Sequence, residues 1–321
     1  MKWIGVEMNA GPRLSIGLPV YNGENYLAES LDALLGQTYE DFELIISDNA
    51  STDGTVDICR RYAKQDSRVR YIRQRRNIGA APNHNYLVDE ARGELFKWAS
   101  DDDLYARDMI KLCVEALDEK PGVVLAHPWT AFIDGSGTVT KACRYPLATA
   151  SPHAPERFRS MLFEDGGDDD GGVVRMSVLR RTAPYNSYHH ADRTLVTGIA
   201  LQGPFYQVPD WLYFRRDHPD RLTRSSTDVQ SLCAKLDPRR ANRLRHPAPR
   251  LYGEYIWGFV AAVRSAPLSP ADRRECYRYI AEWLTSRAVP GRRGTAEAEA
   301  PAPTPDISVN TVVAGRERSP A

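Results

Sequence analysis

Residues 14–55 read LSIGLPVYNGENYLAESLDALLGQTYEDFELIISDNASTDGT, and this stretch decides the fold. It begins with an apolar run of strand length, residues 14–20, which ends at the turn residues Asn22 and Gly23. Leucines at helical spacing follow, on one side of an otherwise polar segment. FELIISD, residues 42–48, is a second apolar run of strand length. A strand, a helix and a strand in this order predict a βαβ unit, in which the two strands lie parallel.

The same alternation continues after the quoted stretch. Apolar runs predict further strands and amphipathic segments predict further helices, at 69–73, 94–100 and 122–127 for the strands and at 53–65, 82–91 and 105–120 for the helices. Repeated βαβ units predict a parallel sheet with helices on both faces. Ligands bind such sheets at the carboxyl ends of the strands. We therefore expect the loops after Val20, Asp48, Arg73 and Ser100 to converge on one site.

The second half of the chain is less regular. The patterns predict a hairpin at 129–140, a short helix at 155–163, two short strands around Pro209 within 203–216, and mainly helices at 231–287. From Gly291 the composition turns to Ala, Pro, Glu and Thr, which cannot bury enough apolar surface to offset the entropy of ordering. The expected organisation is a flexible leader at 1–12, an α/β domain at 13–228, a helical extension at 229–290 and a disordered tail at 291–321.

The charge balance excludes several classes of protein. Lys plus Arg and Asp plus Glu both number 42, so the formal net charge is zero, which argues against a nucleic-acid coat or a polybasic membrane binder. Basic residues nevertheless gather at 60–76 and 211–250, and acidic residues at 89–119 and 164–170. No secretory signal or membrane-spanning segment is evident, and the scattered cysteines form no CxxC pair. We expect a cytoplasmic protein that binds no nucleic acid.

Three adjacent aspartates, Asp101 to Asp103, directly follow the predicted strand 94–100. Neighbouring carboxylates repel one another, so a strand end that carries three of them favours a bound cation. Mg²⁺ or Mn²⁺ is the expected ion, because such ions take oxygen ligands and bridge carboxylates to phosphates. The alternative is a solvated acidic cap on the following helix. A second acidic group, Asp165 with Asp168–Asp170, lies between glycine pairs and favours a solvated loop over a metal site.

Other polar residues follow the predicted strands. Asp48 ends the second strand, while Asn77 and Gly79 follow the third beside Arg75 and Arg76, whose guanidinium groups suit phosphate oxygens. Turn formation alone also accounts for Asp48. The first strand is not followed by the G-x-G-x-x-G of dinucleotide-binding proteins, and the sequence has no G-x-x-x-x-G-K-[ST] of P-loop proteins. A nicotinamide enzyme and a P-loop NTPase are therefore disfavoured.

Four short elements, taken together and in order, resemble a known family. They are P-x-Y-N at 19–22, D-N-x-S-x-D-G-T at 48–55, N-x-G at 77–79 and D-x-D at 101–103. Over roughly residues 14–135 the chain is similar to the family 2 glycosyltransferases, which have a GT-A fold. The resemblance implies an α/β protein with a mixed, mainly parallel sheet flanked by helices, followed here by a helical C-terminal extension.

The resemblance also implies a site for a nucleotide-sugar donor. In such enzymes the first loop and the aspartate after the second strand hold the nucleobase and ribose, which here implies Pro19, Tyr21, Glu24 and Asp48. The D-x-D aspartates bind the metal and the ribose and diphosphate of the donor. We expect Asp103 on the metal, Asp101 on the ribose or a metal-bound water, and Asp102 beside them. Asn77 and Gly79 are expected in the same donor site.

The base implied by the resemblance is Asp192, in HHADRTLVTGIALQG. Inverting transfer needs a carboxylate that takes the proton of the acceptor hydroxyl group. The family usually has an acidic pair at this place, whereas Ala191 precedes Asp192 here, and helix capping would explain the same aspartate. His189 and His190 are rival bases.

A basic segment, WLYFRRDHP at 211–219, is expected to close over the donor. A leaving diphosphate gains negative charge, which Arg215, Arg216 or His218 would stabilise. The alternative is an exposed basic strand end.

The function predicted from these features is inverting, metal-dependent sugar transfer from a nucleoside-diphosphate sugar, with UDP as the expected nucleotide. The expected acceptor is a glycan, a lipid-linked sugar or a small molecule, and a lipid-linked acceptor would require peripheral association with the inner face of the membrane. Aromatic residues in 251–287 suit either a membrane or partner surface or, as we favour, packing on the core. The oligomeric state is left open.

Two alternatives belong to other classes. A catalytically silent GT-A domain that serves as a binding or scaffolding subunit is disfavoured by the intact motifs. A nucleotidyltransferase on a related sheet would need a first loop rich in glycine and arginine with a lysine, and PVYNGENY has neither arginine nor lysine.

Overall fold

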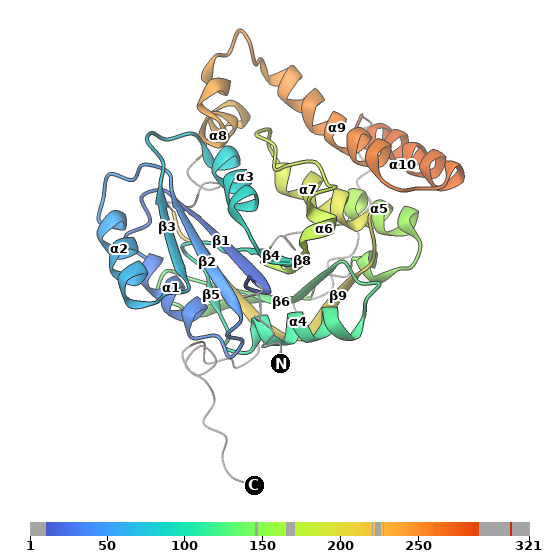
Figure 1. Cartoon of the computed structure of the whole chain (residues 1–321). Helices are drawn as coiled ribbons and strands as arrows, with labels where there is room; N and C mark the ends of the chain where they lie inside the picture. Colours follow the sequence, from blue (N-terminus) through green and yellow to red (C-terminus); the bar gives the residue numbers. More distant parts are fainter. Residues whose placement is uncertain are drawn as a thin grey trace, which may run out of the picture.

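The protein is described here by a computed structural model that covers residues 11–144, 147–164, 171–219, 221, 226, 228–288 and 309. These residues form a central β-sheet with helices on both sides (Figure 1). Most of the predicted leader and tail, and the acidic group Asp165 with Asp168–Asp170, lie outside the described residues. None of the helices in the described part of the chain is both long enough and apolar enough to cross a membrane.

The N-terminal half of the sheet has the predicted parallel arrangement. The strands β1 (Leu14–Val20), β2 (Phe42–Asp48), β3 (Val69–Arg73) and β4 (Leu95–Trp98) alternate with the helices α1 (Leu27–Leu35), α2 (Thr55–Gln65) and α3 (Ala80–Glu90). Their spatial order is β3-β2-β1-β4, and every neighbouring pair is parallel. β2 is buried at all of its positions, because helices cover both faces of the sheet, and this explains its continuous apolar run.

The other half of the sheet is mixed. The order continues from β4 through β8 (Val173–Arg175), β6 (Leu125–Ile133), β9 (Phe205–Arg216) and β5 (Leu104–Tyr105), and β7 (Val139–Cys143) pairs with β6 as a hairpin. The pairs β4–β8, β8–β6 and β9–β5 are antiparallel, whereas β6–β9 is parallel. The mixed α/β sheet flanked by helices is therefore confirmed.

Several elements differ from the prediction, since β6 joins the predicted strand 122–127 to the first arm of the predicted hairpin 129–140. Residues 203–216 contain one long strand, β9, instead of two, because its pairing with β6 skips Pro209 and Asp210 and then resumes. Pro209 has no amide hydrogen for the ladder, and a local irregularity accommodates it without ending the strand. The helix α4 (Met109–Glu119) begins later than predicted, because Leu104–Tyr105 pair with β9 as a short strand.

The helices bury their apolar sides in three clusters. α1, α2 and α4 share one cluster with Leu44 and Ile46, whereas α3, α6 (Met176–Leu179) and α7 (Ala191–Ala200) share another with Ile45. Alternate residues of β2 thus face opposite helical layers, as the period of a strand requires. The third cluster joins α5 (Ala154–Phe163), α7, α9 (Ala248–Ser265) and α10 (Pro270–Ala288), and Figure 1 shows α9 and α10 side by side beyond α7.

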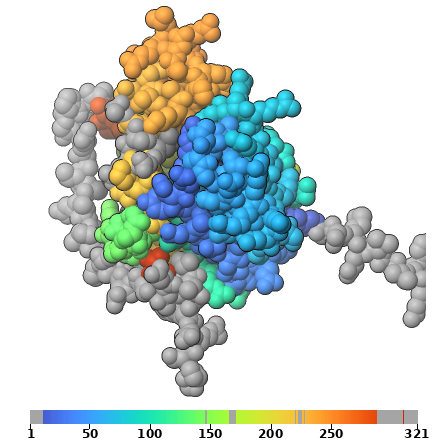
Figure 2. Space-filling model, turned by 90° about the vertical axis from the view of Figure 1, so that its left-hand side faces the viewer, coloured from blue at the N-terminus to red at the C-terminus, as the bar shows by residue number. Residues whose placement is uncertain are grey.

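The predicted helical extension is thus packed on the rest of the chain. Its aromatic residues Phe259 and Trp283 are buried in the third cluster, as favoured from the sequence, whereas Trp257 is 58% exposed. The helix α8 (Val229–Leu236) contacts the short 3-10 helix η3 (Pro238–Ala241) as well as α3 and α9. The space-filling view shows this part of the chain, in orange, above the blue N-terminal half (Figure 2).

Gly79 allows α8 to approach the N-terminal half closely. It has a positive φ of 95°, and a Cβ atom there would lie 2.5 Å from the carbonyl oxygen of Leu236 at the end of α8. A side chain at this position would therefore both strain the backbone and collide with α8. The close approach brings residues of α8 to the carboxyl ends of the parallel strands.

Candidate active site

A cleft of about 710 Å³ opens at the carboxyl ends of the parallel strands. Its walls come from all four of the loops that were predicted to converge: residues 19–26 at the end of β1 and after it, Asn49 and Asp53 after β2, Asn77 after β3, and Ser100 to Asp102 after β4. Three basic side chains from the second half of the chain complete the lining, namely His218, Arg221 and Lys235. The topology therefore assembles one site from segments that are far apart in the sequence.

Hydrogen bonds between the first two loops hold this part of the cleft in place. The Asn22 amide donates to the Ser51 hydroxyl at 2.9 Å, and the Asn22 side chain accepts from the Thr52 amide at 2.9 Å. Asn22 has a positive φ of 55°, a left-handed conformation that asparagine adopts more readily than most residues. The loop after β1 is therefore fixed by its neighbour.

The three predicted donor-binding residues of the first loop, Pro19, Tyr21 and Glu24, all line the cleft. Tyr21 is 48% exposed, so its ring is accessible to a ligand. The Glu24 carboxylate accepts from the Gly54 amide at 2.7 Å, and the Glu24 amide donates to Asp53 at 3.2 Å. Glu24 thus links the first loop to the start of α2.

Asp48 ends β2 as predicted but does not line the cleft. Its buried carboxylate accepts from the Ser51 amide at 2.8 Å and from the Tyr71 hydroxyl at 2.9 Å. The Nε atom of Arg73 lies 3.4 Å from the same carboxylate. These contacts hold the turn after β2, and a direct role of Asp48 on the nucleobase or ribose stays a prediction.

Asn77 and Gly79 have different surroundings. Asn77 lines the cleft, and its side-chain oxygen accepts from the Asn49 side chain at 3.1 Å and from the Gly79 amide at 2.9 Å. Gly79 does not line the cleft, and it packs instead against the end of α8. Of these two predicted donor-site residues, only Asn77 lies where a ligand could touch it directly.

The three aspartates of the acidic loop divide into two that face the cleft and one that does not. Asp101 and Asp102 line the cleft, whereas Asp103 is fully buried. Both carboxylate oxygens of Asp103 have protein donors, the Tyr213 hydroxyl on one and the Arg216 amide, at 2.8 Å, on the other. Of the two predicted metal ligands, the structure therefore brings Asp101 into the cleft, and direct metal binding by Asp103 stays a prediction.

The acidic loop holds more negative charge than its surroundings stabilise. Burial, and then the charges of Asp102 and Asp103, raises the pKa of Asp101 to about 8. Burial, and then the charge of Asp102, raises the pKa of Asp103 to about 6. The described residues contain no cluster of three His, Cys, Asp or Glu side chains around a cation site. Mg²⁺ nevertheless fits here, because it is commonly held by one or two carboxylates together with substrate phosphates.

Asp102 has partners that favour its charged form. The Ser100 hydroxyl donates to one oxygen, and Nε2 of His218 lies 3.0 Å from the other. Burial opposes ionisation, but the Arg221 guanidinium and these two hydrogen bonds keep the pKa of Asp102 below its usual value. His218, which was predicted to contact the diphosphate, thus lies in the cleft beside the acidic loop.

The two arginines that were predicted to contact the diphosphate, Arg215 and Arg216, do not line the cleft. Arg216 is 1% exposed, and its Nε atom donates to the carbonyl of Asp102 at 2.8 Å. Its other guanidinium nitrogens donate to the Gly135 carbonyl at 2.9 Å and to the Glu29 carboxylate at 2.8 Å. Arg216 therefore anchors the acidic loop to two other segments, and a contact with a ligand diphosphate stays a prediction for both arginines.

Sequence reasoning missed several residues that line the cleft, among them Asn83, His84, Arg221 and Lys235. Nδ1 of His84 lies 2.8 Å from the Ala80 carbonyl, and the ring stacks on Tyr185 with centroids 4.9 Å apart. Asn83 and His84 lie one turn after the N-x-G element, which is the signal that could have indicated them. Arg221 and Lys235 belong to the basic block at 211–250, but nothing in that block distinguishes them from the other basic residues.

The predicted base, Asp192, lies in the first turn of α7 and does not line the cleft. Its Oδ1 atom accepts from the Arg193 amide at 2.8 Å. The N-cap position is occupied by His190, with a positive φ of 54° and no side-chain cap hydrogen bond, so Asp192 is not the N-cap residue. His189 is buried against Tyr255, and burial, followed by His190, lowers its pKa to about 4. The role of base stays a prediction for all three candidates.

Comparison with known proteins identifies the class that this fold and cleft define. The family described as "Glycosyl transferase family 2" matches residues 15–183, from β1 to the loop after α6. The chain belongs to this family and is a glycosyltransferase.

Two bacterial relatives are named as glycosyltransferases. The glycosyltransferase GlyG of Streptococcus pneumoniae serotype 4 is 32% identical over 222 residues, which cover 67% of this chain and 72% of GlyG. The putative teichuronic acid biosynthesis glycosyltransferase TuaG of Bacillus subtilis is 32% identical over 112 residues, which cover 35% of this chain and 44% of TuaG. The similarity to TuaG therefore spans less than half of either protein.

Solved structures agree on the fold. Residues 1–349 of S. aureus TarS, in complex with UDP-GlcNAc, match with a TM-score of 0.60 and 18% identity over 85% of this chain and 71% of that one. The mannosyltransferase PcManGT from Pyrobaculum calidifontis, in complex with GDP-Man and Mn²⁺, matches with a TM-score of 0.50 and 17% identity over 87% of this chain and 88% of that one. At these identities the likeness shows the GT-A fold alone.

Proposed function

We propose that this glycosyltransferase is an inverting enzyme that moves a sugar from a nucleoside-diphosphate sugar to a hydroxyl group of a glycan, lipid-linked or small-molecule acceptor. The observation that carries the proposal is the composition of the cleft, where Asp101 and Asp102 share one space with His218, Arg221 and Lys235. Carboxylates suit a divalent cation and basic side chains suit a diphosphate. A donor that presents both groups would satisfy this pattern.

UDP is the proposed nucleotide of the donor. TarS was solved with UDP-GlcNAc, and PcManGT with GDP-Man, so nucleoside-diphosphate sugars are the ligands of both structural neighbours. In this chain the first loop supports a nucleoside site, because Tyr21 offers an exposed ring and Asn22 is fixed by hydrogen bonds to the next loop. A loop that is held before the ligand arrives loses little entropy on binding.

Asp101 and Asp102 are the residues that we propose to hold Mg²⁺ or Mn²⁺, because their carboxylates line the cleft. The ion, when bound, would neutralise negative charge on the donor diphosphate. Asp103 would bind it directly only after exchanging the Tyr213 and Arg216 donors, and with those donors in place it orients the loop. PcManGT contains Mn²⁺, which supports this class of cofactor.

Asp192 is the residue that we propose to take the proton of the acceptor hydroxyl group. A carboxylate in this role accepts the proton as the hydroxyl oxygen attacks the sugar. The loop that leads into α7 touches the donor cleft, since Tyr185 stacks on His84, and this supports a position of α7 on the acceptor side. His218 and Arg221 would meanwhile stabilise the charge on the leaving diphosphate.

We further propose that the enzyme acts in the cytoplasm, and at the inner face of the membrane when its acceptor is lipid-linked. The five cysteines are all unpaired, which is the usual state of thiols in a reducing compartment.

The test is release of nucleoside diphosphate from a panel of UDP-, GDP- and TDP-sugars with Mn²⁺, with and without EDTA. We expect release from a UDP-sugar that EDTA abolishes. Asp102→Asn should lose most of this activity, whereas Glu115→Gln, which removes an exposed carboxylate on α4, should keep it. Silence across the panel, with no nucleotide binding by calorimetry, would contradict the proposal and support a binding or scaffolding domain.

A further inference from the structure

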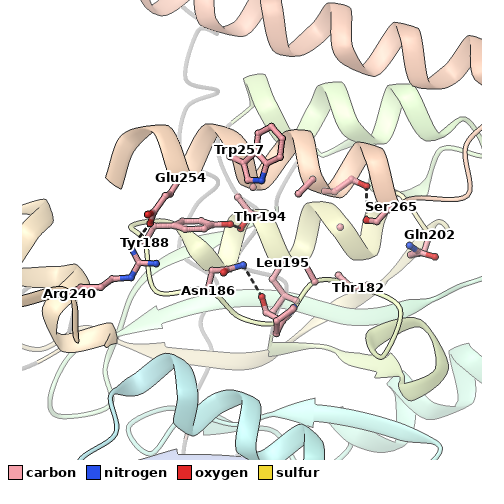
Figure 3. A pocket seen from close by; sticks show the side chains of 16 residues that line it. Thr182, Asn186, Tyr188, Thr194, Leu195, Gln202, Arg240, Glu254, Trp257 and Ser265 are labelled. Carbon is pink, nitrogen blue, oxygen red and sulfur yellow. Dashed lines mark hydrogen bonds and ion pairs between the residues drawn. The ribbon is translucent and has the colours of Figure 1, made fainter. Parts of the chain in front are cut away.

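A second cavity, of about 330 Å³, lies outside the donor cleft, between the loop 182–188 and the helices α7 and α9 (Figure 3). The Tyr188 and Thr194 hydroxyl groups lie 2.9 Å apart in its wall and hydrogen-bond to each other. Gly258 of α9 lies directly against the Tyr188 hydroxyl, and a Cβ atom there would overlap with it. This wall is therefore fixed by the hydrogen bond between the two hydroxyl groups and by the close packing of Tyr188 on α9.

The side chains around this cavity suit a sugar ring. Arg240 and Glu254 form an ion pair at one end, and Gln202 lies at the other (Figure 3). Trp257 projects from α9 between them and is 58% exposed. A guanidinium–carboxylate pair offers several donors and acceptors to neighbouring hydroxyl groups, and an indole offers a flat apolar face. A sugar has hydroxyl groups at its edge and C–H groups on its faces, so it can use both.

The loop 182–188 lines the second cavity and packs against a residue that lines the donor cleft. Its Tyr185 stacks on His84, which lines the donor cleft, while Asn186 and Tyr188 line the second cavity. Asn85 fixes the loop, because its side chain accepts from the Tyr185 amide at 2.9 Å and donates to the Tyr185 carbonyl at 2.8 Å. The loop thus connects the second cavity to His84 and its neighbour Asn85 on α3.

The segment that contains α8 and η3 contributes residues to both cavities. Lys235, on α8, lines the donor cleft, and Arg240, in η3, lines the second cavity. Arg240 is fixed there by hydrogen bonds to the Ser187 hydroxyl at 2.6 Å and to Glu254. The second cavity is therefore a neighbour of the donor cleft along two separate segments.

We propose that the second cavity is an acceptor subsite that binds one sugar unit of a glycan acceptor. This inference rests on the transferase function proposed above and specifies the acceptor as a chain of sugars. The unit bound is an uncharged sugar, either a hexose or an N-acetylhexosamine, because the paired charges of Arg240 and Glu254 suit a ligand with many hydroxyl groups and no net charge. A place beside the donor cleft suits a sugar next to the one that is extended.

Saturation-transfer NMR tests the cavity directly, with methyl glycosides and disaccharides of glucose, galactose, mannose, N-acetylglucosamine and N-acetylgalactosamine as probes. We expect saturable binding of at least one probe, about tenfold weaker in Trp257→Ala. Ala261→Phe, which fills the cavity from α9, should abolish the binding. Tyr277→Ala removes another exposed ring, on α10, and should bind the probe like the wild type.

UDP affinity in the presence of Mn²⁺, measured on the same samples, separates the two claims and reports on folding. It should stay within about twofold of the wild-type value in all three variants. A wild type that binds UDP but no probe, or cavity variants that bind the probe normally, would overturn the subsite and leave the transferase function standing. Probe binding without UDP binding would overturn the proposed donor function, and binding of neither would overturn both.

Discussion

The donor cleft and the second cavity are built in different ways, although loop 182–188 and the segment of α8 and η3 connect them. The donor cleft is assembled from loops at the ends of parallel strands, and hydrogen bonds between neighbouring loops fix its polar side chains. The second cavity is formed by packed helices and one loop, with a ring against a glycine and an ion pair at its edge. Polar motifs thus define the first site, and side-chain packing defines the second.

This difference indicates that the second cavity tolerates substitutions better than the donor cleft does. The residues of the donor cleft depend on one another, because each loop is bonded to the next, so a change in one loop disturbs its neighbours. Among the described residues, the second cavity has no lining residue in common with the donor cleft, and Tyr188 and Ala262 in its wall belong to the buried cluster around Phe259. We therefore expect substitutions in the cavity to alter acceptor choice without altering the donor cleft.

The largest expected effect is the loss of transfer in Asp192→Asn. A general base contributes about 10²- to 10⁴-fold to the rate, so kcat should fall within this range while UDP affinity stays unchanged. The measurement is steady-state transfer together with UDP calorimetry, and Asp210→Asn, an exposed aspartate of β9, is the control. Transfer at the wild-type rate by Asp192→Asn would show that another residue is the base.

Substitutions of Arg216 and Arg221 should have different effects, the first mainly on stability and the second mainly on UDP binding. Arg216→Gln removes a buried guanidinium that donates to the carbonyl groups of Asp102 and Gly135 and to the Glu29 carboxylate, so the free energy of unfolding should fall by about 2–4 kcal/mol. Arg221→Gln should change stability less and weaken UDP binding more, because Arg221 lines the cleft. Urea denaturation and calorimetry on both variants measure the two quantities. An Arg216→Gln protein of normal stability that no longer binds UDP would restore the sequence-based assignment to the diphosphate.

Gly23→Ala, in the loop after β1, should displace Asp101 of the acidic loop. A Cβ atom at this position would overlap with the Asp101 carboxylate and lie 2.8 Å from Val20, so the carboxylate must move. We expect metal-dependent UDP binding to weaken about tenfold, with little change in UDP binding measured in EDTA. Gly122→Ala is the control, because no atom lies within 4 Å of a Cβ there. Equal UDP affinities of the Gly23→Ala and Gly122→Ala proteins would argue against a metal role for Asp101.

The smallest expected effect is the contribution of His189, just before α7, to the pH dependence of stability. Burial lowers its folded-state pKa from 6.5 to about 4, so the unfolded chain binds more protons between these pH values. The neutral ring therefore contributes stability above pH 6.5 that is lost as pH falls towards 4, by about 1–2 kcal/mol. His189→Phe keeps an aromatic ring against Tyr255 and should flatten this part of the stability profile. Identical slopes of the two profiles between pH 6.5 and 4 would contradict the buried neutral state.

Much of the fold and part of the site could be predicted from the sequence. Period and length of the apolar runs predicted β1, β2 and β3 with their bounds, and the parallel topology predicted which loops meet. These features are local, or follow from a rule about strand ends. The convergence of residues 19–26 with Asp101 and Asp102 is of this kind.

The positions of Asp103 and Arg216 could not be predicted, because they depend on long-range pairing. Asp103 is bonded to Tyr213, 110 residues away, and Arg216 to the carbonyl of Asp102, 114 residues away. Both contacts follow from the pairing of β5 with β9, and a two-residue strand carries no periodic signal. The second cavity was missed for a similar reason, since it is formed by loop 182–188 meeting a distant helix.

The most direct test of the central claim is a calorimetric titration of the wild-type protein with UDP, in Mn²⁺ and again in EDTA. The cleft is proposed to bind a nucleoside diphosphate through a cation held by Asp101 and Asp102. Saturable binding in Mn²⁺ should therefore weaken at least about tenfold in EDTA, and Asp101→Asn should bind UDP in Mn²⁺ as weakly as the wild type does in EDTA. Equal affinity in Mn²⁺ and EDTA, or no binding in either, would contradict the account.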